Sequence, residues 1–204
     1  MPMLRELVED CKDRGFPIRK YGTWFHQIRP DKHAALNFWG DPRQDFPIIN
    51  SNIHNHDTSF TSTVLLGETE NTRYQCVVDP HGDLQGYNVN KNPSSSLQHA
   101  IPSGDNYCVV SQELQVCSAG MVYVMAAPEF HITVVKVPTI TQLNIWRDGP
   151  FQQVSLIPQG TTLNTTTTRR DLSVQEEIEA WLCIESFLDV YEQTVPGLIP
   201  HTPS

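Results

Sequence analysis

The sequence predicts a mainly β protein, an antiparallel sandwich or barrel with a helix near each end. Helical periodicity occurs only near the two ends, and the roughly 150 residues between them show almost none. Gly, Pro, Asn and Asp separate short β-like runs at spacings typical of antiparallel sandwiches and barrels. The predicted strands cover 62–67, 72–78, 107–111, 114–117, 121–127, 130–137, 142–147 and 153–157.

The terminal helices are predicted from apolar spacing and from their end signals. Apolar residues at i, i+3, i+4 and i+7 predict a helix over 4–14, which Gly15 ends. A second helix is predicted over 173–191, where Ser173 and Glu176 form a capping-box pattern. The apolar stripe of this second helix is expected to cover the core, with a homodimer contact as its alternative role. The stripe comprises Val174, Ile178, Trp181, Leu182 and Leu188.

The chain of 204 residues is expected to form a single domain, 1–204, because this length is enough to bury one core. The barrel itself is expected at about 45–158. The stretch 82–106 is polar and rich in Gly, Ser, Asn and Pro, so it is predicted to be a loop inserted over one end of the sheet.

Composition excludes several classes of function. A net charge of −9 and a pI near 5.2 argue against a nucleic-acid surface and against docking on anionic lipid. No apolar run is long enough to span a membrane, and the first residues lack the pattern of a secretory signal. The five cysteines are scattered and include no CxxC motif, which indicates reduced thiols and a cytoplasmic location.

A pair of histidines, His54 and His56, precedes a predicted strand. Side chains at i and i+2 of an extended segment point to the same face, so the two imidazoles are expected to lie side by side. Two adjacent imidazoles are poor core material and good ligands for one metal ion, provided that a third group joins them.

The His54–Gly67 segment and a second segment, Gly120–His131, resemble the two conserved motifs of the cupin superfamily. In the first motif, His54, His56 and Gly67 match the family's His-x-His and the Gly that follows it. In the second, Gly120, a strand, Pro128 and His131 match, with seven residues between Gly and Pro where the family usually has five. The resemblance covers residues 50–146 and implies a jelly-roll barrel in which His54, His56 and His131 hold a metal.

One position departs from the cupin pattern, because Phe60 stands where most cupins have a metal-binding Glu. The remaining three-His set is similar to that of cysteine-dioxygenase-like cupins. This resemblance implies a divalent metal, Fe(II) first, with Ni, Cu, Zn or Mn as alternatives. It also implies a non-haem oxygenase or dioxygenase whose substrates are O₂ and a small molecule. Because the site lacks one carboxylate, an anionic substrate is favoured.

Other residues are candidates for the surroundings of this metal. Strand alternation predicts that Tyr123, Met125, Thr133 and Val135 line the interior. Tyr123 is a candidate catalytic residue, and Met125 and Thr133 are candidate substrate contacts, with ordinary core packing as the alternative. Phe60 is expected to shape access to the metal. Arg73 is a candidate catalytic residue that would clamp a substrate carboxylate, and a surface Arg on an edge strand is the alternative. His81 and His99 are candidates for a fourth ligand or a lid, or are exposed loop residues.

Two further functions stay open. "HDT" at 56–58 and "HIT" at 131–133 are both His-x-Thr, which is similar to the motif pair of two-histidine phosphoesterases. That resemblance implies metal-free acid–base chemistry by His56 and His131, with Thr58 and Thr133 holding phosphate. The continuous apolar strand and the helices of that family are missing from the sequence pattern. A cupin that binds a small molecule without catalysis is the third alternative.

Overall fold

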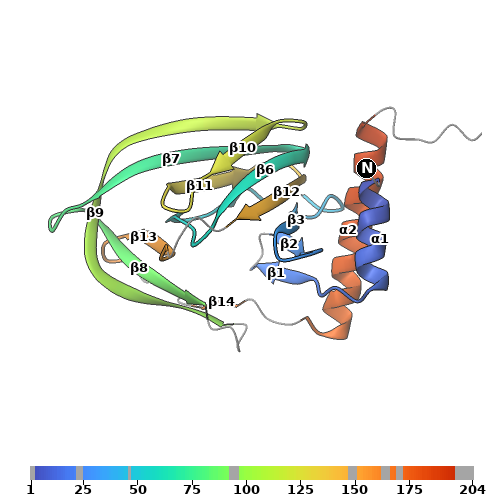
Figure 1. Cartoon of the computed structure of the whole chain (residues 1–204), viewed down its shortest axis with the longest axis horizontal. Helices are drawn as coiled ribbons and strands as arrows, with labels where there is room; N and C mark the ends of the chain where they lie inside the picture. The colour runs from blue at the N-terminus through green and yellow to red at the C-terminus, as the bar shows by residue number, and fades with distance from the viewer. Residues whose placement is uncertain are drawn as a thin grey trace, which may run out of the picture.

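The computed structural model describes residues 3–21, 25–45, 47–91, 97–146, 151–161, 166–168 and 172–195. In these residues it contains two helices and fourteen strands (Figure 1). The helices are α1 (Leu4–Asp13) and α2 (Val174–Thr194). The strands are β1 (Arg19–Tyr21), β2 (Phe25–Ile28), β3 (Ala34–Trp39), β4 (Ile49–Asn50), β5 (Ile53–His54), β6 (Ser59–Leu66), β7 (Glu68–Val78), β8 (Leu84–Lys91), β9 (Leu97–Ser118), β10 (Val122–Met125), β11 (Phe130–Val135), β12 (Thr139–Trp146), β13 (Val154–Pro158) and β14 (Thr166–Thr168).

The strands form two sheets, and all their pairings are antiparallel. The first sheet has the order β1-β2-β3-β12-β6-β10, and the second has the order β14-β9-β7-β11-β5-β13-β8, with β4 beside β11. The two sheets make a jelly-roll-like sandwich, so the predicted mainly β fold with a helix at each end is confirmed.

Strand β9 closes the second sheet on itself. Its 22 residues curve around one end of the sandwich (Figure 1). The half that includes residues 107–118 pairs with β7, and the half that includes residues 98–107 pairs with β8. Since β8 also pairs with β13, the second sheet curls until its two ends meet in β9.

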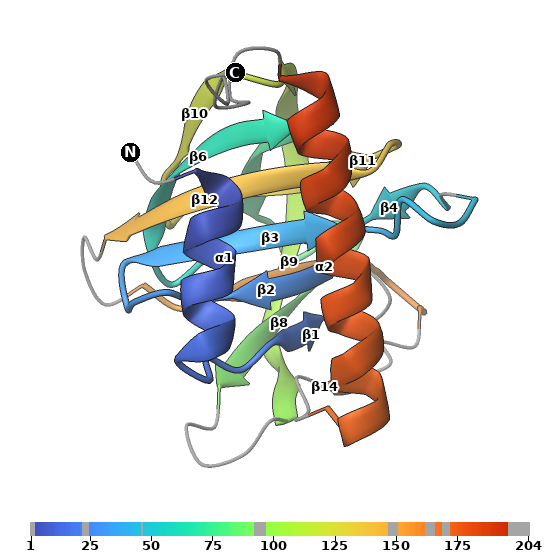
Figure 2. The ribbon, with the colours of Figure 1, turned by 90° about the vertical axis from the view of Figure 1, so that its right-hand side faces the viewer.

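The two helices lie together over the outer face of the first sheet (Figure 2). They bury one apolar cluster against that face, and the rings of Phe38 in β3 and Phe187 in α2 lie 5.7 Å apart within it. Arg5 of α1 adds ion pairs to Glu185, Asp189 and Glu192 of α2. The fully buried members of the cluster include Val8, Cys11, Ile28, Leu36, Ile140 and Ile184.

Helix α2 begins as predicted, with a capping box between Ser173 and Glu176. Its apolar stripe is only partly as predicted, because Val174, Ile178 and Leu182 are exposed, whereas Leu188 is buried and Trp181 packs against the apolar cluster. The buried face of the helix consists of Ala180, Cys183, Ile184, Phe187 and Leu188. Neither helix combines the length and the apolar character that a bilayer crossing requires.

Two predicted boundaries are wrong. The stretch 82–106 is not a loop, because most of it forms β8 and the first half of β9. The sandwich also begins at Arg19 and not near residue 45, since β1, β2 and β3 form half of the first sheet. The five cysteines are all unpaired thiols, as predicted.

Candidate metal centre

Three histidines come together in the second sheet. His54 ends β5, and His131 in β11 is its direct cross-strand partner. His56 follows two residues after His54. Between them, Asn55 forms two hydrogen bonds with the Val154 backbone, one through its N–H and one through its side-chain oxygen. This anchor fixes Asn55 against β13, so the histidines on either side of it share a face.

The three imidazole rings form a compact triangle. Their centroids are 4.5 Å apart for His54 and His131, and 4.9 Å apart for each of the other two pairs. Within the described residues, one nitrogen from each ring lies within 4.8 Å of the others, and no fourth His, Cys, Asp or Glu joins this group. The Nε2 atoms of His56 and His131 are 3.3 Å apart.

Backbone carbonyls determine which nitrogen of two rings is free. Nδ1 of His54 lies 2.8 Å from the carbonyl oxygen of Asn52, and Nδ1 of His131 lies 3.4 Å from that of Glu129. A carbonyl oxygen only accepts, so each Nδ1 donates its proton and each Nε2 keeps a lone pair. Metal-binding histidines are held in the same way in known metal sites.

Burial favours the neutral form of His54 and His131. It lowers the pKa of His131 well below its ordinary value, and the charges of His54 and Arg73 lower it further. Burial also lowers the pKa of His54. Since only neutral imidazole binds a metal, the site favours the ligand form over a wider pH range than free histidine does.

The donor set fits a divalent metal ion. Metal–nitrogen bonds near 2.1 Å place neighbouring ligand atoms about 3.0–3.4 Å apart in octahedral or tetrahedral geometry. The 3.3 Å between Nε2 of His56 and Nε2 of His131 falls in that range. Three neutral imidazoles suit Fe, Ni, Cu or Zn, and they leave coordination positions open.

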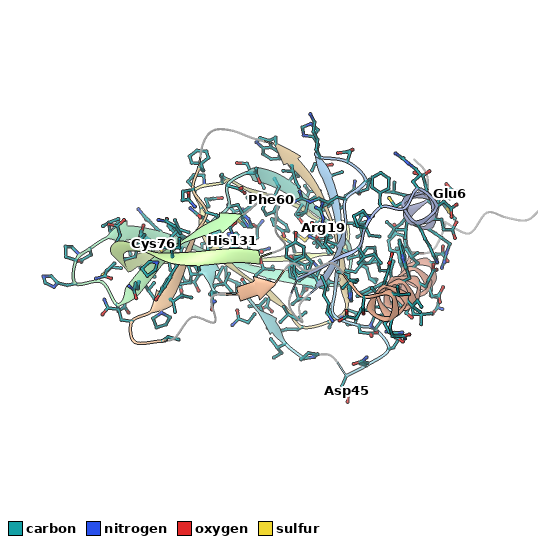
Figure 3. The ribbon with its side chains drawn as sticks, turned by 90° about the horizontal axis from the view of Figure 1, so that it is seen from below. Glu6, Arg19, Asp45, Phe60, Cys76 and His131 are labelled. Carbon is teal, nitrogen blue, oxygen red and sulfur yellow. The ribbon has the colours of Figure 1, made fainter. Side chains whose placement is uncertain are left out.

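Phe60 forms one wall of the centre. This side chain in β6 is buried, and its ring meets the His56 ring edge-on with 5.1 Å between centroids. Figure 3 shows Phe60 and His131 together in the middle of the sandwich. An apolar ring therefore stands at the position where the resemblance to cupins predicts a carboxylate ligand.

Arg73 lies beside the centre and not on an edge strand. It is the cross-strand partner of His131, so both side chains project from the same face of the second sheet. Its guanidinium donates to the Val124 carbonyl at 2.6 Å and to the Gln115 side chain at 3.2 Å, and it pairs with Glu129 at 3.5 Å. Its Nε is buried and has no acceptor in the described part of the chain. A hollow of about 630 Å³ opens next to Arg73 and Glu129.

The predicted interior residues are buried, at different depths from the histidines. Met125 in β10 is the cross-strand partner of Phe60 in β6. Tyr123 is the partner of Ser62, two residues further along β6 from the histidines. Burial raises the pKa of Tyr123, and the nearby polar groups of Ser62, Asn71 and Thr69 lower it. Thr133 lies on the His131 face, and its hydroxyl donates to the Asn71 side chain at 2.8 Å. The contacts given for Tyr123, Met125 and Thr133 do not include the three histidine rings. Catalysis by Tyr123 and substrate contact by Met125 and Thr133 therefore stay predictions.

Of the two additional histidine candidates, the structure describes the surroundings of His81 alone. His81 is exposed in the turn between β7 and β8, where its backbone N–H donates to Asp79. The side chain of His99 lies outside the part of the chain that the structure describes.

Sequence reasoning missed Glu129. Its carbonyl orients His131, and its carboxylate accepts from the Ala126 N–H at 3.0 Å and pairs with Arg73. The sequence signal that could have identified Glu129 is its position, two residues before His131 in the turn that contains Pro128.

Both motif glycines have a structural reason. Gly67 and Gly120 adopt positive φ angles of 75° and 88° in the turns that follow β6 and β9. At Gly67 a Cβ would also collide with the Pro138 carbonyl oxygen and the Thr139 hydroxyl. These turns set the direction of the strands on which the motif residues lie.

The topology and the histidine triangle define a cupin-like β-sandwich protein with a candidate three-His metal centre. Solved structures that resemble it include one from a study of the mechanism of oxalate oxidase, at 11% identity and a TM-score of 0.35, covering 80% of this chain and 63% of that chain. A complex of oxalate oxidase with the substrate analogue glycolate matches at 13% identity and a TM-score of 0.33, covering 81% and 64%. The capsular polysaccharide assembling protein CapF from Staphylococcus aureus matches at 11% identity and a TM-score of 0.35, covering 84% and 40%.

The chain therefore spans less than two thirds of the length of each of these proteins. The sequence matches no family model and no curated protein. Because the TM-scores are low, the assignment of the site rests on the geometry of this chain.

Proposed function

We propose that this protein is a metal-dependent cupin enzyme, a non-haem Fe(II) oxygenase or dioxygenase acting on a small anionic molecule. The observation that carries the proposal is the triangle of His54, His56 and His131, with two of its rings oriented by backbone carbonyls. A divalent metal bound there supplies open positions for a substrate and for O₂. The location that we propose is the cytoplasm.

Arg73 is the residue that we propose binds the anionic group of the substrate. It faces the same side of the sheet as His131, and its buried Nε lacks an acceptor among the described residues. A buried donor without a partner is costly, and a carboxylate oxygen would satisfy it with a charge-assisted hydrogen bond. Glu129, Gln115 and the Val124 carbonyl hold the guanidinium in place for this contact.

The first test measures the metal content of histidine variants. His54→Ala, His56→Ala and His131→Ala each remove one of three ligands, so we expect each purified variant to retain less than about a tenth of the wild-type metal. Thermal unfolding should stay cooperative, because the three apolar clusters that the structure describes contain none of these histidines. Elemental analysis of protein prepared without chelator or a nickel column provides the measurement.

His81→Ala is the matched control, since it removes an exposed histidine from the turn between β7 and β8. It should retain wild-type metal. Near-stoichiometric metal in all three cluster variants contradicts the site. Metal retention without oxygen consumption across small carboxylic acids favours a binding protein that has no catalysis.

The phosphoesterase alternative receives less support from the structure. His56 and His131 do approach each other, but His54 completes a triangle that metal-free acid–base chemistry does not need. The hydroxyl of Thr133 is used in a buried hydrogen bond to Asn71. The described residues between the two His-x-Thr motifs contain strands and no helix.

Two threonine variants separate these enzyme classes. For a cupin, Thr58→Ala should leave turnover nearly unchanged, and Thr133→Ala should cost about 1 kcal/mol of stability through its lost hydrogen bond while metal stays bound. For a phosphoesterase, each variant should lose about 2–4 kcal/mol of transition-state stabilisation, and activity should persist in EDTA. Steady-state kinetics and denaturant unfolding of both variants, with and without EDTA, measure the difference.

A further inference from the structure

A second hollow lies away from the histidine triangle. It measures about 380 Å³ and is lined by Phe16, Pro17, Arg19, Arg29, Asp31 and Lys32. The residues come from the segment after α1, from β1 and from the turn between β2 and β3, and none of them belongs to the candidate metal centre. Figure 3 places Arg19 between the labelled His131 and the α1 residue Glu6.

A buried hydrogen-bond network orients one of the cations in this hollow. Nε of Arg29 donates to the side-chain oxygen of Gln27 at 3.0 Å, and the hydroxyl of Tyr21 donates to the same oxygen at 3.2 Å. The amide nitrogen of Gln27 donates to Asn37 at 2.8 Å, which fixes the orientation of the amide. Gln27 and Asn37 are both buried, at 4% and 3% exposure, so this support is rigid.

The outer half of the Arg29 guanidinium is available for a ligand. Within the described residues, its two terminal amino groups have no hydrogen-bond or ion-pair partner, and the ammonium group of Lys32 has none either. Arg19 is the cross-strand neighbour of Gln27, so its side chain projects from the same face of the sheet. Asp31 accepts a hydrogen bond from the His33 backbone N–H and makes no ion pair in the described part of the chain.

The charge of the hollow is opposite to that of the protein. Among the described residues that line it, three cations and one carboxylate give a net charge of +2, whereas the whole chain carries −9. The like charges that line this small volume repel one another, and a dianion bound there would lower that repulsion. A guanidinium held through Nε presents its two terminal amino groups as a planar fork, which matches the oxygen spacing of phosphate.

We propose that this hollow is a binding site for a phosphate dianion, either free or as the phosphate group of an ester. Arg29 provides the bidentate contact, and Arg19 and Lys32 provide additional positive charge. Phe16 and Pro17 form an apolar wall that would contact the organic part of an ester. The proposal is independent of metal binding by the histidines.

Calorimetric titration of the full chain with inorganic phosphate and with phenyl phosphate tests the proposal. Arg29→Gln should weaken binding by about tenfold to a hundredfold, because charge-assisted hydrogen bonds contribute on that scale. Asp31→Asn should tighten binding by about threefold, since it removes the one carboxylate among the described residues that line the hollow. If Arg29 and Asp31 had only a structural role, Asp31→Asn would not raise the affinity for phosphate.

Lys20→Gln is the matched control, because it removes one positive charge from the same strand as Arg19 but from the opposite face. It should change affinity less than about twofold. Equal losses in Lys20→Gln and Arg29→Gln, or no saturable binding at about 20 mM phosphate, would overturn the proposal. Binding that disappears after EDTA treatment belongs to the histidine site and overturns it also. Tighter binding of phenyl phosphate than of inorganic phosphate identifies an ester as the ligand.

Discussion

At the scale of single residues, the candidate metal centre shows which parts of a site the sequence can predict. The spacing of His54 and His56 determines their shared face, and motif matching identified His131 as the third ring. The cross-strand position of Arg73 beside His131 depends on the register between β7 and β11, which no local pattern encodes. The roles of the Asn52 and Glu129 carbonyls were also inaccessible, because backbone groups have no sequence signature.

At the residue scale, substitution of Phe60 gives the most direct test of the metal centre. Since its ring contacts His56, a carboxylate introduced there would reach the open side of the triangle. Phe60→Glu should tighten metal binding by about tenfold or more, because it adds an anionic fourth ligand. The same carboxylate occupies a position that substrate or O₂ needs, so turnover should fall. Competition titration with a chromophoric chelator measures affinity, and oxygen uptake measures turnover.

Phe60→Gln is the matched control for this change. It introduces a polar side chain of similar size without the negative charge, so it should not tighten metal binding. Without metal, Phe60→Glu should also lower the unfolding temperature, since a buried carboxylate loses its hydration. If Phe60→Glu and the wild type bind metal equally, residue 60 does not face the centre and the motif alignment is incorrect.

At the scale of elements, the helices were predictable and several strands were not. Apolar residues at helical spacing, with a capping box in α2, are local signals. Strand β3 is buried on both faces, with Leu36 and Phe38 toward the helices and Asn37 in a polar network inside the sandwich, so it lacks the usual alternation. The β8–β9 hairpin looked like a loop because polar residues dominate 82–106. Its strands are held by backbone pairing to β7 and β13.

The exposed stripe of α2 keeps the homodimer prediction open at this scale. Val174, Ile178 and Leu182 follow one another at intervals of four residues and are 77%, 49% and 49% exposed. Such a stripe on a helix is the kind of surface that a second helix covers. The homodimer contact predicted from the sequence would form there, and sedimentation of Ile178→Glu beside the wild type would detect it.

The pairing of α1 with α2 gives a prediction about stability. Arg5 contacts three carboxylates of α2 at 2.7–2.9 Å, and its side chain is 24% exposed. Arg5→Met keeps the apolar stem but leaves Glu185, Asp189 and Glu192 to repel one another, so the free energy of unfolding should fall by about 1–2 kcal/mol. Urea unfolding at low salt measures this loss, and raising the salt to about 1 M should shrink it.

The control for this prediction is an exposed ion pair at the C-terminal end of α1. Arg14 pairs with Asp10 one turn away, and the two side chains are 61% and 55% exposed. Arg14→Met should therefore cost less than about 0.5 kcal/mol. Equal losses in the two variants would mean that the three-carboxylate contact of Arg5 does not fasten α1 to α2.

At the scale of the whole molecule, the first sheet has a different chemical character on each face: one face lines the inside of the sandwich and the other packs against the helices. Its inner face carries polar groups such as Gln27, Asn37 and Thr141, which are buried and hydrogen-bonded. Its outer face packs apolar side chains against both helices. Polar residues usually indicate exposed positions, so β1, β2 and β3 did not look like core strands in the sequence. The predicted start of the sandwich was therefore too late.

His26 makes the helix-covered interface sensitive to acid. It is the cross-strand partner of Phe38, so it lies on the face that α2 covers, and its Nδ1 is buried without a partner in the described residues. Burial and the nearby charges of Lys20 and Arg43 lower its pKa from 6.5 to about 4, although Asp41 opposes this. Between these two pH values the unfolded chain binds the proton more readily than the folded protein. Stability should therefore fall as the pH drops from about 6.5 to 4, by up to roughly 3 kcal/mol.

Replacing His26 tests this account of the whole molecule's acid sensitivity. His26→Phe substitutes a ring that cannot bind a proton, so the variant should lose less stability between pH 7 and pH 4 than the wild type does. His81→Phe, which alters an exposed histidine in the turn between β7 and β8, should keep the wild-type pH dependence. Urea unfolding of the three proteins at each pH provides the comparison. Parallel curves for His26→Phe and the wild type would show that the proton on His26 does not control packing between the first sheet and its helices.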